Sequence, residues 1–268
     1  MRRFRDYDPF AWLYNRYWAS DFHRAVLPVL DRTVLAKLAP GAAILDLCCG
    51  DGRLAASLAR RGFRVTGLDG SAQMLSFARR RAPETQFLLA DAREFRLPRS
   101  FHAVLSLFDS LNHVMKTEDL EKVFGNVWRC LKPGGVFLFD LNSEQAYREM
   151  WSQTASTVDV NVVSVAKGSY SAERRIAICD ITLMRLKNDL WSRSDFRMRQ
   201  KLHPREAVLK SLKSAQFEAC MHAASQLGMQ GDLAYGRDFY IAKKEDRSQK
   251  TEDRILHRPP ASGRKQTL

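Results

Sequence analysis

The sequence predicts an α/β fold built on a parallel sheet. Apolar runs of four to six residues alternate with helical segments, and the runs fall at residues 43–47, 64–68, 86–89, 103–107 and 136–141. Few polar residues interrupt these runs, as expected for strands that are buried on both faces. Strands that alternate with helices at this spacing favour βαβ units, whose strands run parallel.

Three predicted helices connect these strands, within residues 52–62, 71–81 and 117–135. Ser71 and Thr117 are predicted N-caps, because their hydroxyl oxygens can accept hydrogen bonds from the free N–H groups of a first helical turn. Gly62 and Gly134 stand where two of the helices are predicted to end.

The pattern changes after residue 141. Residues 157–165 and 174–186 are rich in strand-forming residues, and residues 192–202 alternate, with Phe196, Met198 and Leu202 on one face and a row of charged residues on the other. We expect an antiparallel ribbon added to the sheet, with the charged row facing solvent. A helix over residues 203–216, with Pro204 in its first turn, and a last strand at 236–244 complete the chain.

Composition indicates one principal domain, residues 40–242, which follows an N-terminal helical cap at 1–39. The polar, basic residues 243–268 are predicted to be a disordered tail. No apolar stretch is long enough for a membrane span or a signal peptide, so we expect a cytoplasmic protein that does not bind membranes. The five Cys lack metal-ligand spacing and are expected to be reduced core residues, with no metal site. A net charge of +13 permits a nucleic-acid partner without favouring one, and the oligomeric state stays open.

The first strand ends in the loop "ILDLCCGDG", residues 44–52. In an open parallel sheet, ligands bind beyond the carboxyl ends of the strands. Gly50 and Gly52 allow the backbone to turn tightly and to approach a ligand. A dinucleotide fingerprint would place glycines at 48, 50 and 53, and only Gly50 fits it, since the other positions are Cys48 and Arg53.

Three acids leave three consecutive strands: Asp46, Asp69 and Asp91. A carboxylate at 69 can accept hydrogen bonds from both hydroxyls of a ribose, and one at 91 can accept from an exocyclic amine. A strand-end cap would explain one such acid, but it explains a regular series of three poorly.

The series "ILDLCCGDG", "GLDGSAQML", "ADARE", "FHAVLSLFDSLNHV" and "LKPGGVFLFDLN" resembles the class I S-adenosylmethionine-dependent methyltransferases over residues 40–142, and more loosely to 242. The resemblance implies a Rossmann-like, doubly wound sheet of seven strands whose last strand is antiparallel, and S-adenosyl-L-methionine as cofactor. The family commonly has Gly or Ala where this chain has Cys48. The cofactor-binding residues that the resemblance implies are Tyr14, Asp46, Cys48, Gly50, Gly52, Asp69, Gly70, Met74, Asp91, Ala92 and Phe108.

The exit of the fourth strand, "LFDSLNHV", lacks the Asn/Asp-Pro-Pro-aromatic stretch of DNA amino-methyltransferases, and no Pro-Cys pair of a cytosine C5 enzyme occurs. With "YDPFAWLYNRYW" and the ribbon, it resembles the glycine and amino-sugar N-methylating branch, where the N-terminal helix and the inserted strands, here 157–202, cover the active site. The resemblance implies that His113 and Tyr7, with Tyr14 as an alternative to Tyr7, lie near a substrate amine.

Aromatic residues crowd the N-terminal segment, and they either close over a cationic cofactor or pack a helix on the core: Tyr7, Phe10, Trp12, Tyr14 and Trp18. The hypothesis that follows is methyl transfer, by in-line displacement, to N or O of a small molecule. Two alternatives stay open at this point: an RNA or protein methyltransferase, and a non-catalytic paralogue that binds the cofactor.

Overall fold

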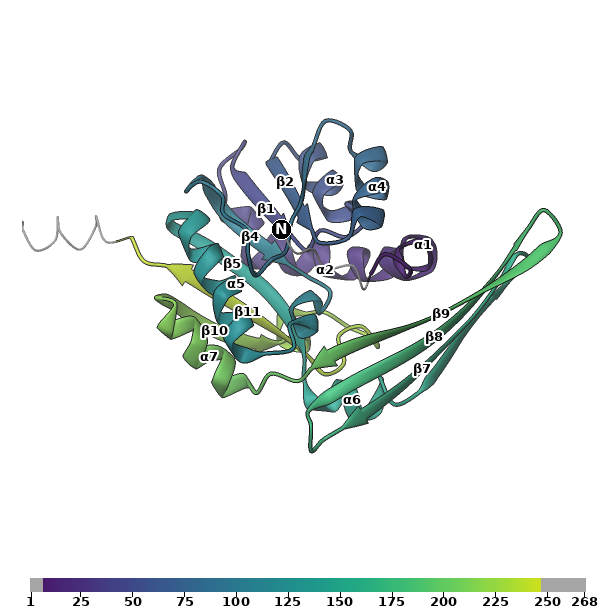
Figure 1. Ribbon diagram of the computed structural model, residues 1–268. Coiled ribbons are helices and arrows are strands. Elements are labelled where there is room, and N and C mark those ends of the chain that lie inside the picture. Colours follow the sequence, from purple (N-terminus) through teal and green to yellow (C-terminus); the bar gives the residue numbers. More distant parts are fainter. Residues whose placement is uncertain (1–6, 247–268) are drawn as a thin grey trace, which may run out of the picture.

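The computed structural model describes residues 7–246, which contain two separate sheets. The larger sheet has seven strands in the order β10-β11-β5-β4-β1-β2-β3 (Figure 1). All of its neighbouring pairs are parallel except those that involve β11, which runs antiparallel to β5 and β10. The predicted doubly wound sheet with an antiparallel last strand is therefore confirmed. Its strands are β1 (Ala43–Leu47), β2 (Arg64–Asp69), β3 (Gln86–Leu89), β4 (Phe101–Ser106), β5 (Leu131–Asn142), β10 (Phe217–Ala223) and β11 (Arg237–Lys244).

Helices cover both faces of this sheet. The N-terminal segment forms α1 (Ala11–Leu13), a π-helical turn (Tyr14–Trp18) and α2 (Ala19–Thr33). The connecting helices are α3 (Arg53–Arg60), α4 (Ala72–Arg81), α5 (Thr117–Cys130), α6 (Glu144–Glu149) and α7 (Arg205–Ser214), and 3₁₀ turns lie at Leu35–Lys37, Ser110–His113 and Ala224–Leu227.

The predicted helix ends are partly confirmed. Ser71 caps α4, because its Oγ accepts a hydrogen bond from the Met74 N–H at 3.1 Å. The predicted cap at Thr117 is wrong, since Thr117 is the first helical residue of α5 and Lys116 is the N-cap residue. This helix starts with acidic side chains in its first turn, which favour the positive end of the helix dipole. It also ends at Cys130, four residues before Gly134, because β5 begins at Leu131.

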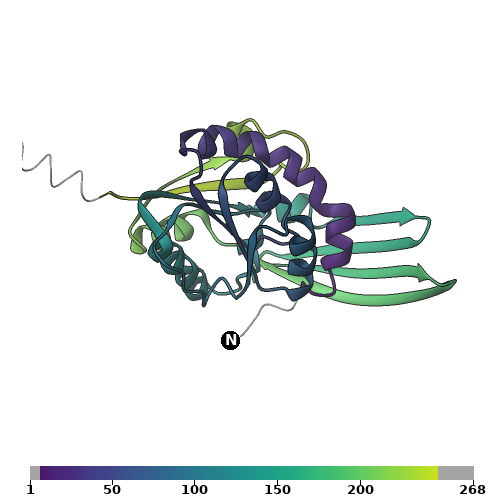
Figure 2. The same ribbon diagram turned by 90° about the horizontal axis from the view of Figure 1, so that it is seen from above.

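The inserted strands form a sheet of their own, so the expected ribbon is not hydrogen-bonded to the larger sheet. Its strands are β6 (Thr154–Asp159), β7 (Val162–Ser171), β8 (Ile176–Lys187) and β9 (Leu190–Lys201), all antiparallel to their neighbours. The ribbon extends away from the body of the molecule, and its far end projects past the helices (Figures 1 and 2). The predicted alternation of β9 is confirmed: Met198 is buried, whereas Arg193 and Arg197 are exposed and form ion pairs with Asp195 and Asp180.

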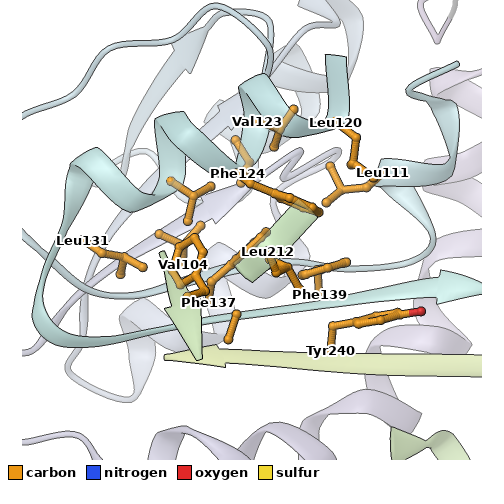
Figure 3. Close-up of a cluster of buried hydrophobic side chains, with 14 of the residues drawn as sticks. Val104, Leu111, Leu120, Val123, Phe124, Leu131, Phe137, Phe139, Leu212 and Tyr240 are labelled. Atoms are coloured by element: carbon orange, nitrogen blue, oxygen red, sulfur yellow. The ribbon is translucent and has the colours of Figure 1, made fainter. Parts of the chain in front are cut away.

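The core lies where the helices meet the central strands. Side chains of β5 alternate between the two faces, so Phe137 and Phe139 contact α5 while Leu138 packs with α2 on the opposite face. Figure 3 shows Leu120, Val123 and Phe124 of α5 above the aromatic side chains of β5 and β11. Tyr240 stacks on Phe139 with ring centroids 4.9 Å apart. This packing holds the carboxyl ends of the strands in fixed positions.

The cysteines and the tail differ in detail from expectation. All five Cys are free thiols, but Cys220 is exposed on the edge strand β10 instead of buried. β11 continues through Lys244, so the first two residues of the predicted tail belong to the sheet, and the Lys244 ammonium donates to the Trp128 and Leu131 carbonyls. Residues 1–6 of the predicted cap and 247–268 of the predicted tail lie outside the described residues. Within residues 7–246, every helix is too short or too polar to cross a bilayer.

Replacing Phe137 by Ala should lower the free energy of unfolding by about 3–5 kcal/mol, because a fully buried ring leaves a cavity that the sheet cannot close. Urea unfolding measures the change. The control is Leu190→Ala at the exposed end of the ribbon, where the side chain is 74% exposed and a change within about 0.5 kcal/mol is expected. Equal losses in the two variants would contradict the described core.

Candidate active site

Three adjoining cavities lie at the carboxyl edge of the larger sheet. The first encloses about 740 Å³ of space, its open mouth included. All of the predicted site residues line it except Asp46 and Gly52. Asp46 lines the third cavity, which shares Tyr14, Cys48 and Phe108 with the first. Gly52 instead permits packing, because a Cβ on it would lie 2.7 Å from the Ala78 Cβ.

Asp69 joins two loops at the end of β2. Its Oδ2 accepts a hydrogen bond from the Gly50 N–H at 2.9 Å, and its Oδ1 accepts from the Ser71 N–H at 2.8 Å. Each carboxylate oxygen has two lone pairs, so each keeps one for a ligand hydroxyl. Burial raises the pKa of Asp69 to about 6, although the N–H groups of Ser71 and Gly50 oppose that rise.

Asp91 differs from expectation, because it already has a strong partner. Oδ1 accepts from the Arg93 backbone N–H and Nε, both at 2.8 Å, and Oδ2 accepts from Arg93 Nη2 at 2.5 Å. The carboxylate lines the first cavity as predicted. An exocyclic amine there would share Oδ2 with the guanidinium, because both lone pairs of Oδ1 are used.

Asp46 is the least satisfied acid of the series. It is 3% exposed, and its Oδ2 has no hydrogen-bond partner among residues 7–246. Burial, and after it the negative charge of Asp69, raises the pKa of Asp46 to about 8. Burying a carboxylate without a partner is costly, so this oxygen is suited to a cationic ligand group.

The loops at the cavity walls contain strained backbone. Cys48 has φ 60°, and the consecutive residues Phe108 and Asp109 have φ 60° and 47°. Side chains of this size rarely adopt left-handed conformations, and such residues concentrate at functional sites. A positive φ suits Gly better than Cys, so the backbone at Cys48 is strained. Burial raises the pKa of the Cys48 thiol, so the side chain stays protonated.

The second cavity adjoins the first, and Tyr7, Tyr14 and Phe108 line both. It encloses about 1200 Å³ of space, its open mouth included. Its walls come from the N-terminal segment, the ribbon and the loop before β11, and many of them are aromatic. The predicted aromatic cluster does pack on the ribbon, since Phe10 and Trp18 contact one another at a ring distance of 4.9 Å and Phe10 lies 5.9 Å from Phe196.

His113 stands between Tyr7 and the ribbon. Its Nδ1 lies 2.9 Å from the Arg199 carbonyl oxygen, and because a carbonyl only accepts, Nδ1 carries the proton. Nε2 therefore has a lone pair, which accepts from the Tyr7 hydroxyl at 2.5 Å. Burial and then the charge of Asp109 raise the pKa of Tyr7, so its phenol is a donor and not an anionic base.

A buried polar network, which the sequence pattern did not predict, lies beside His113. The Gln200 amide nitrogen donates to Asp109 Oδ2 at 2.5 Å and lies 3.0 Å from His113 Nε2. Arg237 lies 3.0 Å from Asp109 Oδ1 and also pairs with Asp140. One signal was available: Gln200 is the polar exception on the apolar face of the alternating stretch 192–202.

Comparisons with known proteins agree with this geometry. A family model described as a methyltransferase domain matches residues 44–135. "Putative methyltransferase YqeM" of Bacillus subtilis is 31% identical over 214 residues, which cover 78% of this chain and 87% of that protein. The structure of an S-adenosylmethionine-dependent methyltransferase from Clostridium acetobutylicum has a TM-score of 0.74 at 22% identity, and covers 89% of this chain and 99% of that chain. The chain belongs to the methyltransferases.

A third relative of this methyltransferase matches a shorter stretch. It is the dTDP-3-amino-3,4,6-trideoxy-alpha-D-glucopyranose N,N-dimethyltransferase of Streptomyces venezuelae, 33% identical over 107 residues, which cover 40% of this chain and 45% of that protein.

The residues of the site fit S-adenosylmethionine. The unpartnered Asp46 oxygen suits the cationic methionyl part of that cofactor, and the Asp69 oxygens keep lone pairs for hydroxyls. Gly50 has φ 52°, and among the described residues only the Tyr14 side chain lies within 4 Å of the place where a Cβ would stand, so its backbone is open toward the first cavity.

Asp46→Asn should stabilise the cofactor-free methyltransferase at pH 8. Between the usual Asp pKa, about 3.9, and the folded-state pKa of about 8, the folded protein binds a proton that the unfolded chain has released. Stability from this group is therefore complete below about pH 4 and falls as the pH rises through 8, whereas Asn does not titrate. We expect the melting temperature to rise by at least about 2–4 °C at pH 8, and by less at pH 5.5.

Calorimetric melts of Asp46→Asn and of the control Asp189→Asn, at an exposed turn of the ribbon, test this expectation. The same gain in both variants, or a gain that does not change with pH, would contradict the assignment of a buried, unpartnered Asp46.

Proposed function

We propose that this methyltransferase methylates N or O of a small molecule held in the second cavity. The observation that carries the proposal is the shared wall: Tyr7, Tyr14 and Phe108 line both the first and the second cavity, so two ligands bound there would be neighbours. In this proposal residues 1–39 and the strands of 157–202 cover the methyl acceptor, and 40–242 form the catalytic domain. A concave cavity with these aromatic walls suits a small acceptor better than RNA or a protein.

The first and third cavities are the proposed cofactor site. Asp46 would face the methionyl ammonium, Asp69 would accept from the ribose hydroxyls, and Asp91 with Ala92 would contact the adenine edge. Met74, which is buried in the wall of the first cavity, would pack against the adenine or the ribose. When bound, S-adenosylmethionine supplies a methyl group on a sulfonium, which is already activated for displacement.

His113 and Tyr7 are the proposed catalytic residues. The Nε2 lone pair of His113 can accept the proton of an acceptor amine that arrives protonated, and Nδ1 is held by the Arg199 carbonyl. Tyr7, which donates to this lone pair in the described structure, would hold the imidazole in position until an acceptor amine replaces its hydroxyl. Holding the acceptor aligned and dry is worth up to about 7–11 kcal/mol of the barrier. Nitrogen is the favoured acceptor atom because a base such as His113 is needed to remove the proton of an ammonium. The relative from Streptomyces venezuelae is also named as an N,N-dimethyltransferase.

Asp69→Ala should weaken binding of S-adenosylmethionine at least tenfold, about 1.4 kcal/mol, because two hydroxyl acceptors are lost from the first cavity. Isothermal titration with S-adenosylmethionine, S-adenosylhomocysteine and NAD measures this, and NAD should not bind. Unchanged affinity in Asp69→Ala, or tighter binding of NAD than of S-adenosylmethionine, would refute the proposed cofactor site.

His113→Gln should lower kcat about 100-fold or more with a protonated amine acceptor, because Gln cannot take up a proton. The matched control is His222→Gln on β10, outside the lining of the three cavities, which should keep full activity. Assays at rising salt separate the competing acceptors, since RNA methylation would fall steeply with ionic strength and small-molecule methylation would not. Full activity of His113→Gln across the pH range would remove His113 from the mechanism.

A further inference from the structure

The second cavity has an unusual balance of charge. The charged residues among its described lining are Asp109, Asp232 and Arg237. Arg237 is 6% exposed, and its guanidinium is shared by the carboxyl groups of Asp109 and Asp140. Its positive charge is therefore balanced inside the protein and is not available to an anionic ligand.

Aromatic rings also hold the Arg237 guanidinium in place. The guanidinium carbon lies 4.8 Å from the ring centre of Phe22 and 5.6 Å from that of Phe108, and Nε donates to the Leu233 carbonyl. Turning this side chain toward a ligand would break two ion pairs and this hydrogen bond. Two carboxyl groups, those of Asp109 and Asp140, face this one guanidinium, and Asp232 adds a third acid at the cavity mouth. Among residues 7–246, acids therefore outnumber cations in and directly behind the lining of the cavity.

The other walls suit a cation with an apolar body. Phe10, Trp18 and Trp151 contribute aromatic surface, and Met198 and Cys179 contribute small apolar surface from the ribbon. Aromatic faces carry negative potential, so they attract ammonium groups as well as apolar rings. Phosphate recognition needs the opposite: Arg or Lys side chains, or helix N-termini, that point at the ligand.

We propose that the methyl acceptor is a cationic amine on an apolar or aromatic body, without a phosphate or carboxylate group. The inference rests on the proposed function and names the class of acceptor for the same site. It sets this methyltransferase apart from its Streptomyces venezuelae relative, whose name specifies a dTDP-linked amino sugar and hence a diphosphate. Asp109 is the residue that selects the charge, because its Oδ2 accepts from the Gln200 amide nitrogen, which lies 3.0 Å from His113 Nε2.

Three probes of similar size and different charge test the proposal: 2-phenylethylamine, 2-phenylethanol and 3-phenylpropionate. With S-adenosylhomocysteine bound, their dissociation constants are measured from the quenching of tryptophan fluorescence, since Trp18 and Trp151 line the cavity. The amine should bind at least tenfold more tightly than the alcohol, and the carboxylate should bind most weakly. A dTDP-linked amino sugar, measured by calorimetry, should bind more weakly than the amine.

Asp109→Asn should reduce the preference for the amine over the alcohol at least fivefold while the affinity for the alcohol changes little. Because Asp109 pairs with Arg237, Asp232→Asn provides a second variant at an exposed position of the cavity mouth, and it should shift the same ratio in the same direction by a smaller factor. Asp189→Asn, far along the ribbon, is the matched control and should leave the ratio unchanged.

The inference is overturned if the alcohol or the carboxylate binds as tightly as the amine, if no probe binds to protein that binds S-adenosylhomocysteine, or if the nucleotide sugar binds best. The experiments distinguish failure of this inference from failure of the proposed function. Methyl transfer to the nucleotide sugar would overturn the inference and keep the small-molecule function, whereas absence of cofactor binding would refute the proposed cofactor site itself.

Discussion

The sharing of one buried guanidinium by two carboxyl groups connects the parts of this site. Arg237 begins β11, Asp140 lies on β5, and Asp109 follows β4, so the pairs join three neighbouring segments. Gln200 extends the network to β9 of the ribbon. A buried charge without its partner is strongly destabilising, so each of these positions depends on the others. The strained turn at Phe108 and Asp109 is held by this network, and that turn forms walls of both the first and the second cavity.

The cofactor side of the site follows the opposite principle, because it leaves a buried carboxyl oxygen without a hydrogen-bond partner among the described residues. The negative charge of Asp69 adds to burial in raising the pKa of Asp46, and Asp46 Oδ2 lacks a partner among the described residues. Such groups lower the stability of the free protein, and a cationic ligand relieves the cost when it binds. Asp91 shows the alternative, since Arg93 already satisfies it and the loop needs no ligand there to be stable. Stability and ligand binding thus make different demands on neighbouring acids.

Local patterns predicted the fold well and the site only in part. The strands at 43–47 and 86–89 were predicted to the residue, because each apolar run is bounded by polar or small residues that mark its ends. The position of the three acids at one edge of the sheet could be predicted, because the carboxyl ends of parallel strands lie at the same edge. The polar network could not be predicted in this way, since Gln200 and Arg237 contact residues 91 and 97 positions away in the chain. The ribbon was likewise predicted as strands but not as a separate sheet, because periodicity reveals strand faces and not strand partners.

The ribbon is more than a cover for the proposed acceptor. The backbone carbonyl of Arg199, on β9, fixes the proton of His113 on Nδ1 and so directs the lone pair of Nε2 toward Tyr7. An amine that approaches Nε2 has to replace the Tyr7 hydroxyl, which comes from the N-terminal segment. The chemistry of one imidazole therefore depends on two segments outside the seven-stranded sheet. A common sheet can serve many methyl acceptors in this way, because the groups that fix the tautomer of this imidazole and donate to it belong to the parts added to the sheet.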